Sequence, residues 1–182
     1  MPLALATQPP APSAEETALA ERAVAGDAEA FGELAERTWP SLVRLARVAL
    51  AGDPEAEDVA QEALLVAWRR LGQLRRTERF VPWLRRIAWR EALRAARARR
   101  ELPLLDTPTP DRSESPSPDR RIDVERHLAR LTPRERAVVY LSEVEGKTAA
   151  EIGAELGIAA ATARVHRWHA RRRLGALLEE AP

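Results

Sequence analysis

Apolar residues along this chain recur at the three- and four-residue spacing that is typical of amphipathic α-helices. Residues 15–37 show the pattern, with one apolar stripe formed by Leu19, Ala23, Ala30 and Leu34. No segment alternates apolar and polar residues over the length of a strand, and Val and Ile are sparse relative to Ala, Leu and Arg. The pattern therefore predicts an all-α protein in which each helix buries one face.

Four helices are predicted in the first half of the chain. They cover residues 15–37, 39–50, about 54–71 and a stretch that begins near Pro82. Asp53-Pro54 is a typical helix start, with Asp as the N-cap and Pro at the first helical position. The fourth helix is expected to turn Leu84, Ile87 and Ala88 inward. Its outer face is expected to carry Arg85, Arg86, Arg90, Arg94 and Arg97. Such helices form a helical bundle.

The second half carries sharper helix boundaries. Thr132 with Glu135, and Thr148 with Glu151, have the spacing of capping boxes, so a helix is expected to begin at each. Gly157 fits the left-handed position that ends the second of these helices. A longer basic helix is then expected from about Ala160 to Leu178. A short helix, a glycine-containing turn and a longer helix predict a helix-turn-helix, whose second helix enters the DNA major groove.

Proline-rich stretches divide the chain. Residues 1–14 are rich in Pro and Ala and are predicted to be disordered. Residues 102–118 hold five prolines and are predicted to be a linker. Two small helical domains are therefore expected, at 15–101 and 119–182.

Charge is distributed unevenly, although the net charge is only +1. Residues 15–62 hold twelve acids and four arginines, whereas residues 69–100 hold twelve arginines and two glutamates. Residues 164–173 add five arginines without an acid. Separate arginine clusters on helices favour nucleic acid as a partner, because guanidinium groups suit phosphate and guanine. A solvated basic helix face is the alternative for either cluster taken alone.

Several chemistries find no support in the sequence. There is no cysteine and no glycine-rich phosphate-binding loop. His166 and His169 are surrounded by arginines, which disfavours a metal ion, and Asp58 with Glu62 suggests an exposed acidic face rather than an acid/base pair. We therefore expect no enzyme, no catalytic residue, no metal and no cofactor. The uncharged apolar runs are far shorter than the roughly 20 residues that span a membrane. The N-terminus does not resemble a signal peptide, so a cytoplasmic protein without a membrane or small-molecule partner is expected.

Three segments resemble bacterial RNA polymerase sigma factors of the extracytoplasmic-function (ECF) class within the sigma-70 family. AEDVAQEALLVAW (56–68) is similar to the family's helix with an Asp-x-x-Gln-Glu motif. FVPWLRRIAWREALRAARARR (80–100) is similar to its Phe-x-x-Trp-Leu-x-x-Ile-Ala stretch, and LTPRERAVVYLSEVEGKTAAEIGAELGIAAAT (131–162) matches its helix-turn-helix nearly throughout. The three segments occur in the family's order.

The resemblance implies a sigma factor that binds core RNA polymerase and directs it to promoters. It implies polymerase binding, at a region 2-like domain, through Asp58, Gln61 and Glu62. The same domain would read the promoter −10 element, through Arg85, Arg86, Trp89, Arg90, Arg94 and Arg97. Trp89 itself could either cap the bundle or stack on a base. A region 4-like domain would read the −35 element, through Thr162, Arg164, Val165, His166, Trp168, His169, Arg171 and Arg172. The resemblance also allows an anti-sigma protein as a partner, but the sequence does not identify one.

Two other functions remain open at this point. The first is a helix-turn-helix regulator that binds DNA without polymerase. The second is a helical interaction module whose basic faces contact an acidic protein.

Overall fold

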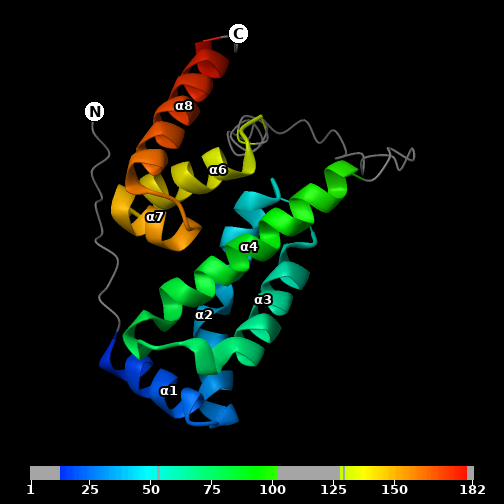
Figure 1. Cartoon of the computed structure of the whole chain (residues 1–182). Helices are drawn as coiled ribbons and strands as arrows, with labels where there is room; N and C mark the ends of the chain where they lie inside the picture. Colours follow the sequence, from blue (N-terminus) through cyan, green and yellow to red (C-terminus); the bar gives the residue numbers. More distant parts are fainter. Residues whose placement is uncertain (1–12, 53, 102–127, 129, 180–182) are drawn as a thin grey trace.

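The protein is described by a computed structural model that covers residues 13–52, 54–101, 128 and 130–179. Every regular element in these ranges is helical (Figure 1). The N-terminal domain contains α1 (Ala14–Val24), α2 (Ala28–Ala49), α3 (Ala56–Arg70) and α4 (Phe80–Glu101). The C-terminal domain contains α6 (Pro133–Val139), α7 (Ala149–Leu156) and α8 (Ala160–Glu179). The predicted all-α fold with two helical domains is confirmed, while the predicted linker at 102–118 lies outside the described residues.

The first two helices have other boundaries than the predicted 15–37 and 39–50, because the break between them lies at residues 25–27. The chain bends at Gly26, whose φ is 101°, and Asp27 then caps α2 by accepting a hydrogen bond from the amide of Ala30 at 3.0 Å. Helix α2 continues through Pro40 instead of ending at residue 37. Proline removes one amide donor, but Pro40 lies at an exposed position, where water can hydrate the freed carbonyl group.

The remaining helix starts were predicted more closely. Helix α1 begins at Ala14 with Ser13 as its cap, inside the stretch expected to be disordered. Helix α3 begins at Ala56, two residues after the predicted Pro54; Asp53 lies outside the described residues. Both predicted capping boxes are present, at Thr132 and Thr148. After α6, the chain continues as a short π-helix, Tyr140–Val144, before the turn to α7.

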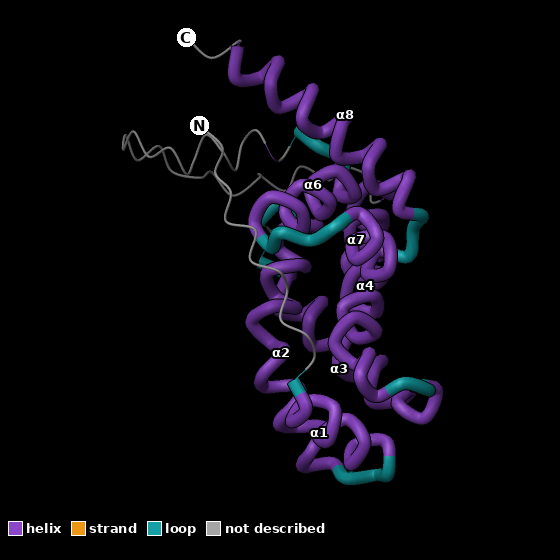
Figure 2. The backbone as a smooth tube through the Cα atoms, turned by 90° about the vertical axis from the view of Figure 1, so that its left-hand side faces the viewer, coloured by secondary structure: helices purple, strands orange, loops and turns teal. Residues whose placement is uncertain are grey.

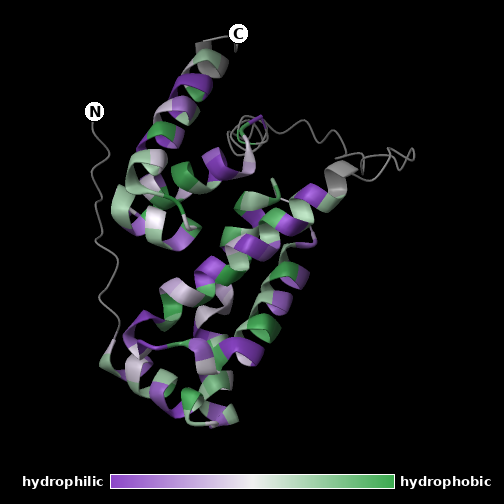
Figure 3. Ribbon diagram, viewed as in Figure 1, coloured by the Kyte–Doolittle hydropathy of each residue, from purple (hydrophilic) through white to green (hydrophobic). Residues whose placement is uncertain are grey.

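Two clusters of buried side chains form the hydrophobic core. The first lies within the N-terminal domain and includes Leu34, Leu42, Phe80 and Leu84. The second joins the two domains. Its members come from α2, α3, α4 and the C-terminal domain, and include Leu45, Val59, Trp89, Ala92, Val138, Leu141, Ile152 and Leu156. Figure 3 shows hydrophilic and hydrophobic residues alternating along the helices of both domains, as expected for amphipathic helices.

The C-terminal domain sits on one end of the N-terminal bundle. Helix α6 contacts α2, and α7 contacts α4. Helix α8 extends away from this junction, and α1 lies at the opposite end of the molecule in both views (Figures 1 and 2). Much of α8 is therefore open to solvent, whereas the C-terminal domain covers one face of α4.

Candidate protein and nucleic-acid interfaces

Arg85 does not lie on an outer face of α4, as the sequence pattern predicted. Its side chain is buried, with 5% of the residue exposed, because the C-terminal domain packs on this face. Its Nη2 donates to both carboxylate oxygens of Glu145 at 2.9 Å, and its Nε donates to Glu155 at 3.1 Å. Burial opposes the charged form of Arg85, but Glu155 and Glu145 outweigh it and raise its pKa, so the guanidinium stays charged.

Two neighbours of Arg85 also contact the C-terminal domain. Arg86 donates from Nε to the carbonyl oxygen of Ala154 in α7 at 2.8 Å. Trp89 is only 1% exposed and belongs to the hydrophobic cluster shared by the domains. Of the two roles considered for Trp89, this position supports packing, since a buried indole cannot stack on a base while the domains are in contact.

The rest of the basic face of α4 is open. Arg90, Arg94 and Arg97 are exposed and line a shallow hollow with Leu93 and Ala98. Arg94 forms an ion pair with Glu91, one turn earlier, at 2.6 Å. The C-terminal domain leaves these three arginines exposed to solvent.

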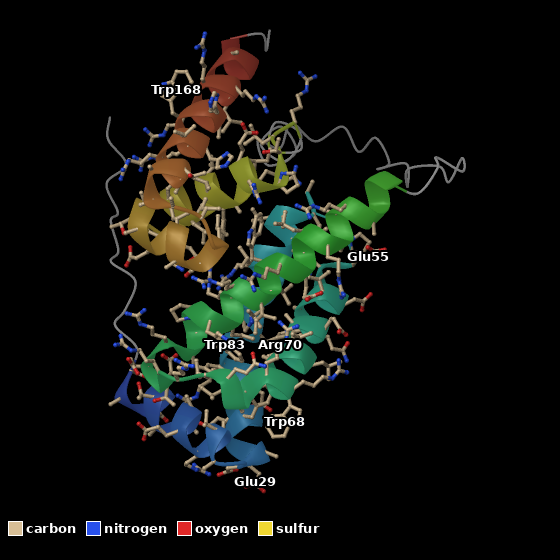
Figure 4. All side chains as sticks on the ribbon, viewed as in Figure 1. Glu29, Glu55, Trp68, Arg70, Trp83 and Trp168 are labelled. Carbon is tan, nitrogen blue, oxygen red and sulfur yellow. The ribbon has the colours of Figure 1, made fainter. Side chains whose placement is uncertain are left out.

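A second basic hollow was not singled out from the sequence. It lies beside the segment between α3 and α4, where two short 3₁₀ turns (Leu71–Gln73 and Thr77–Arg79) lead into α4. Four arginines line it around the half-buried ring of Trp83: Arg75, Arg76, Arg79 and Arg86. The sequence feature that could have indicated this hollow is the arginine-rich segment Arg-Arg-Thr-Glu-Arg at 75–79. It was passed over because the segment has no helical periodicity. Figure 4 shows Trp83 on the N-terminal half of α4.

The predicted polymerase-binding residues share one side of α3. Asp58 and Gln61 are exposed, and Glu62 is half-buried. Asp58 and Glu62 line a shallow groove between α3 and α4, together with Glu55 and Glu91. The groove is therefore rich in carboxylates, and Arg94 also lines it.

Apolar side chains extend the exposed face of α3. Leu65 is 45% exposed and Trp68 is 42% exposed. The ring of Trp68 lies 4.9 Å from that of Phe31 in α2 and is visible at the lower edge of Figure 4. The three residues add an apolar patch to the end of α3 that is far from the C-terminal domain.

The helix-turn-helix presents most of its predicted base-reading residues to solvent. The exposed residues of this set on α8 are Thr162, Arg164, Val165, Trp168, His169, Arg171 and Arg172. Trp168 is 55% exposed and projects away from the rest of the molecule (Figure 4). The guanidinium carbon of Arg172 lies 5.5 Å from the centre of the Trp168 ring, a cation–π arrangement.

His166 differs from its neighbours on α8. It is half-buried and lines a hollow between α4, α6 and α8 together with Leu93, Arg97 and Pro133. Burial, and then the nearby guanidinium of Arg134, lower the pKa of His166. The imidazole is therefore neutral at pH 7 and adds no positive charge to α8.

Two arginines of α8 are paired with carboxylates of their own domain. Arg171 contacts Glu143 at 2.8 Å, and Arg173 contacts Glu135 at 2.9 Å. Both arginines are exposed. These pairs hold the second half of α8 against α6 and the π-helix.

The described residues form neither a membrane-spanning helix nor a cluster of metal-ligating side chains. No helix there is long and apolar enough to cross a membrane. Within the same residues, no group of three or more His, Cys, Asp or Glu side chains could hold a metal ion.

The fold and these surfaces define a two-domain helical protein with a helix-turn-helix and an exposed acidic face on α3. Family models for "Sigma-70 region 2" and "Sigma-70, region 4" match residues 34–101 and 121–174. The chain belongs to the sigma-70 family and is a sigma factor of its ECF class, a protein that directs transcription initiation.

Individual relatives agree with this assignment. The ECF RNA polymerase sigma factor SigM of Mycobacterium tuberculosis is 36% identical over 159 residues, which cover 85% of this chain and 80% of SigM. CarQ, an RNA polymerase sigma factor of Myxococcus xanthus, is 34% identical over 168 residues, which cover 88% of this chain and 95% of CarQ. Among solved structures, CnrH in complex with the cytosolic domain of CnrY is similar with a TM-score of 0.68 and 25% identity, over 92% of this chain and 99% of CnrH.

Proposed function

We propose that this sigma factor binds core RNA polymerase through α3 and promoter DNA through α4 and α8. The observation that carries the proposal is the separation of charge: one face of α3 presents carboxylates, while α4 and α8 present exposed arginines. The carboxylates attract a basic surface of the polymerase, and the arginines attract the phosphates of DNA, so each partner is steered to its own surface.

The polymerase surface consists of Asp58, Gln61 and Glu62. Their exposed or half-exposed positions on α3 support the assignment, because a docking face has to be accessible. The partner surface is expected to be basic, since complementary charge speeds encounter and fixes the register of a complex.

The −10 element is assigned to the basic face of α4. Arg90, Arg94 and Arg97 are open to it in the present arrangement. Arg85, Arg86 and Trp89 belong to the same proposed surface but are covered here by the C-terminal domain.

The −35 element is assigned to α8. Arg164 stands in the first turns of this helix, where a recognition helix meets base edges. Trp168 and Arg172 follow one and two turns later, and their mutual contact supports a role at the backbone or at thymine methyl groups.

The proposal includes no catalytic residue and no cofactor of this chain, because RNA synthesis and its metal ions belong to the polymerase. It also places the protein in the cytoplasm, where polymerase and DNA are found. The solved relative CnrH was determined in complex with CnrY, which supports an anti-sigma partner for this chain as well.

Transcription in vitro tests the proposal. Core RNA polymerase alone, this protein alone and both together are compared on a library of promoter fragments. Specific transcripts are expected only from the combination. A protein that binds duplex DNA tightly without polymerase and yields no transcript would instead be a helix-turn-helix regulator.

A further inference from the structure

We propose that the hollow between α4, α6 and α8 binds a small phosphorylated anion through Arg97, Arg134 and His166. The ligand is a free terminal phosphate or polyphosphate group that enters from solvent. Binding of this anion does not depend on the proposed function, so the two can succeed or fail separately.

Three helices contribute side chains to the hollow. Leu93 and Arg97 come from α4, Pro133 and Arg134 from the start of α6, and His166 from α8. The hollow has a volume of about 320 Å³. Small-molecule sites usually have about 300–1,000 Å³, so this one suits a compact group such as a phosphate rather than a large ligand.

Positive charge in the hollow has no balancing acid. Arg97 and Arg134 are exposed, and none of the described lining residues is a carboxylate. Within the described part of the chain, neither of these two arginines forms an ion pair. Other arginines of the same helices do pair, since Arg94 contacts Glu91 and Arg171 contacts Glu143. The guanidinium groups of Arg97 and Arg134 are therefore free to bind an anion.

Glu135 follows Arg134 in the chain but does not cancel this charge. It is only 5% exposed, and its Oε2 accepts hydrogen bonds from the amide and the hydroxyl of Thr132, both at 2.9 Å. The same oxygen accepts a bond from Arg173 at 2.9 Å. The carboxylate of Glu135 is thus compensated by Arg173, and Arg97 with Arg134 set the potential of the hollow.

His166 adds a polar group to the wall of the hollow. Its ring is half-buried and makes no hydrogen bond to any residue that the structure describes. A neutral imidazole has one N–H donor, and a protonated imidazole has two. An oxygen atom of an anion in the hollow gives this side chain the hydrogen-bond partner that it lacks.

A terminal phosphate matches these donors. Guanidinium groups bind phosphate oxygens through parallel N–H bonds, and such bonds between charged groups are strong. The apolar side chains of Leu93 and Pro133 limit the access of water, which strengthens the attraction between opposite charges. A terminal phosphate offers three oxygen atoms and about two negative charges, whereas each phosphate of duplex DNA carries one charge and is esterified on two sides.

A second hollow along α4 extends the site. Leu93 and Arg97 line both hollows, and the second is also lined by Arg90 and Arg94. A chain of phosphates can therefore contact Arg134 and reach toward Arg90. Tripolyphosphate is expected to bind about tenfold more tightly than inorganic phosphate, because it gains at least one further charge-assisted contact.

Anion binding is expected to be coupled to protonation of His166. Burial is the largest cause that lowers the pKa of this imidazole, followed by the charge of Arg134; Glu135 raises the pKa, and His169 lowers it. Arg97 adds a further positive charge from α4. A bound anion offsets the two arginines and raises the pKa of His166. Affinity is therefore expected to increase as the pH falls from 8 to 6, because the complex then binds more protons than the free protein.

Calorimetric titration of the full chain with tripolyphosphate, at constant ionic strength, tests the site. One ion per chain is expected to bind. Arg97→Gln and Arg134→Gln should each weaken binding by about tenfold or more, because each removes a charge-assisted bond. Arg70→Gln in α3 and Arg130→Gln before α6 are the matched controls, since both arginines are exposed and lie outside the hollow. The controls should retain the affinity of the unchanged protein, and circular dichroism checks that every variant is folded.

A titration with sulfate tests the role of His166. Sulfate is a dianion that does not itself titrate between pH 6 and pH 8, so a change in its affinity reports on the protein. The affinity for sulfate is expected to rise by about threefold at pH 6. His166→Gln should abolish the rise and retain binding at pH 8, whereas His169→Gln should keep the rise. A rise that persists in His166→Gln would remove His166 from the site.

The remaining outcomes overturn the proposal. Absence of binding would do so, and so would equal losses in all four arginine variants, which would indicate general attraction to a basic surface. A random-sequence DNA duplex separates the two sources of phosphate. If the duplex binds and loses affinity in Arg134→Gln, while neither tripolyphosphate nor sulfate binds, the hollow takes backbone phosphate of DNA and the small-anion site does not exist.

Discussion

The Cα of Gly153 faces the carbonyl oxygen of Ile158 so closely that a Cβ on residue 153 would lie 2.6 Å from that oxygen. It would also lie 3.2 Å from the amide nitrogen of Ala160. Both neighbours are backbone atoms of the turn between α7 and α8, so neither can rotate away. The absence of a side chain at Gly153 allows the sharp turn of the helix-turn-helix.

Gly153→Ala is therefore expected to destabilise the C-terminal domain by about 1–3 kcal/mol, the usual cost of overpacking. Gly175→Ala is the matched control, because Gly175 lies in α8 with no neighbouring atom within 4 Å of the added Cβ. The control should be neutral or gain up to about 1 kcal/mol from helix propensity. Thermal unfolding followed by circular dichroism measures both, and equal stability of the two variants would contradict the steric argument.

Asp58→Arg combined with Gln61→Ala is expected to weaken binding to core polymerase by about 1 kcal/mol or more, chiefly through a slower association rate. The fold should be unaffected, since both side chains are exposed. Glu21→Arg makes the same charge change at an exposed position of α1 and serves as the control. Titration of labelled protein with core enzyme gives the affinities. An unchanged affinity for the double variant would place the docking surface elsewhere.

Arg164→Ala and Arg172→Ala are expected to affect −35 recognition differently. Arg164 should discriminate between bases, with a bidentate contact to guanine worth about 1–3 kcal/mol, so its loss should matter only on promoters that carry that guanine. Arg172, which lies over Trp168, should contact phosphate, so its loss should weaken binding evenly and flatten the salt dependence. Affinity is measured on promoters with single base changes. Equal losses on every promoter would make Arg164 another phosphate contact.

Stability of the C-terminal domain is expected to fall in acid. Hydrogen bonds from the Thr148 side chain and then from its backbone amide lower the pKa of Glu151 below its ordinary 4.5. A lowered carboxyl pKa stabilises the folded state above the unfolded-state value, and this contribution is lost as the pH falls through the folded-state pKa.

Glu151→Gln should therefore flatten the decline in stability below about pH 4.5, since it removes the titrating group and keeps a side chain that can cap. Urea midpoints at pH 7 and pH 3.5 provide the measurement. A pH dependence identical to that of the unchanged protein would show that this carboxyl group does not titrate with unfolding.

Local signals in the sequence were sufficient for the helix-turn-helix. The capping boxes at Thr132 and Thr148 and the left-handed Gly157 involve residues within a few positions of one another, so their spacing identifies the helix ends directly. The divided first helix was missed because the prediction followed the apolar stripe across Gly26, and the continuous α2 because separate helices were predicted over 15–37 and 39–50. The break at Gly26 has a local cause, its positive φ and the cap at Asp27, whereas solvent exposure of Pro40 lets α2 continue.

The sequence by itself determined the helical class, the helix-turn-helix and the acidic and basic segments, because periodicity, caps and charge are local properties of the chain. The sequence could not determine which polar residues of a helix are buried against the other domain. Arg85 and Arg90 have the same side chain in the same helix, yet Arg85 is buried against Glu145 and Arg90 is exposed. The difference comes from carboxylates 60 and 70 residues away, which only the tertiary structure brings to Arg85.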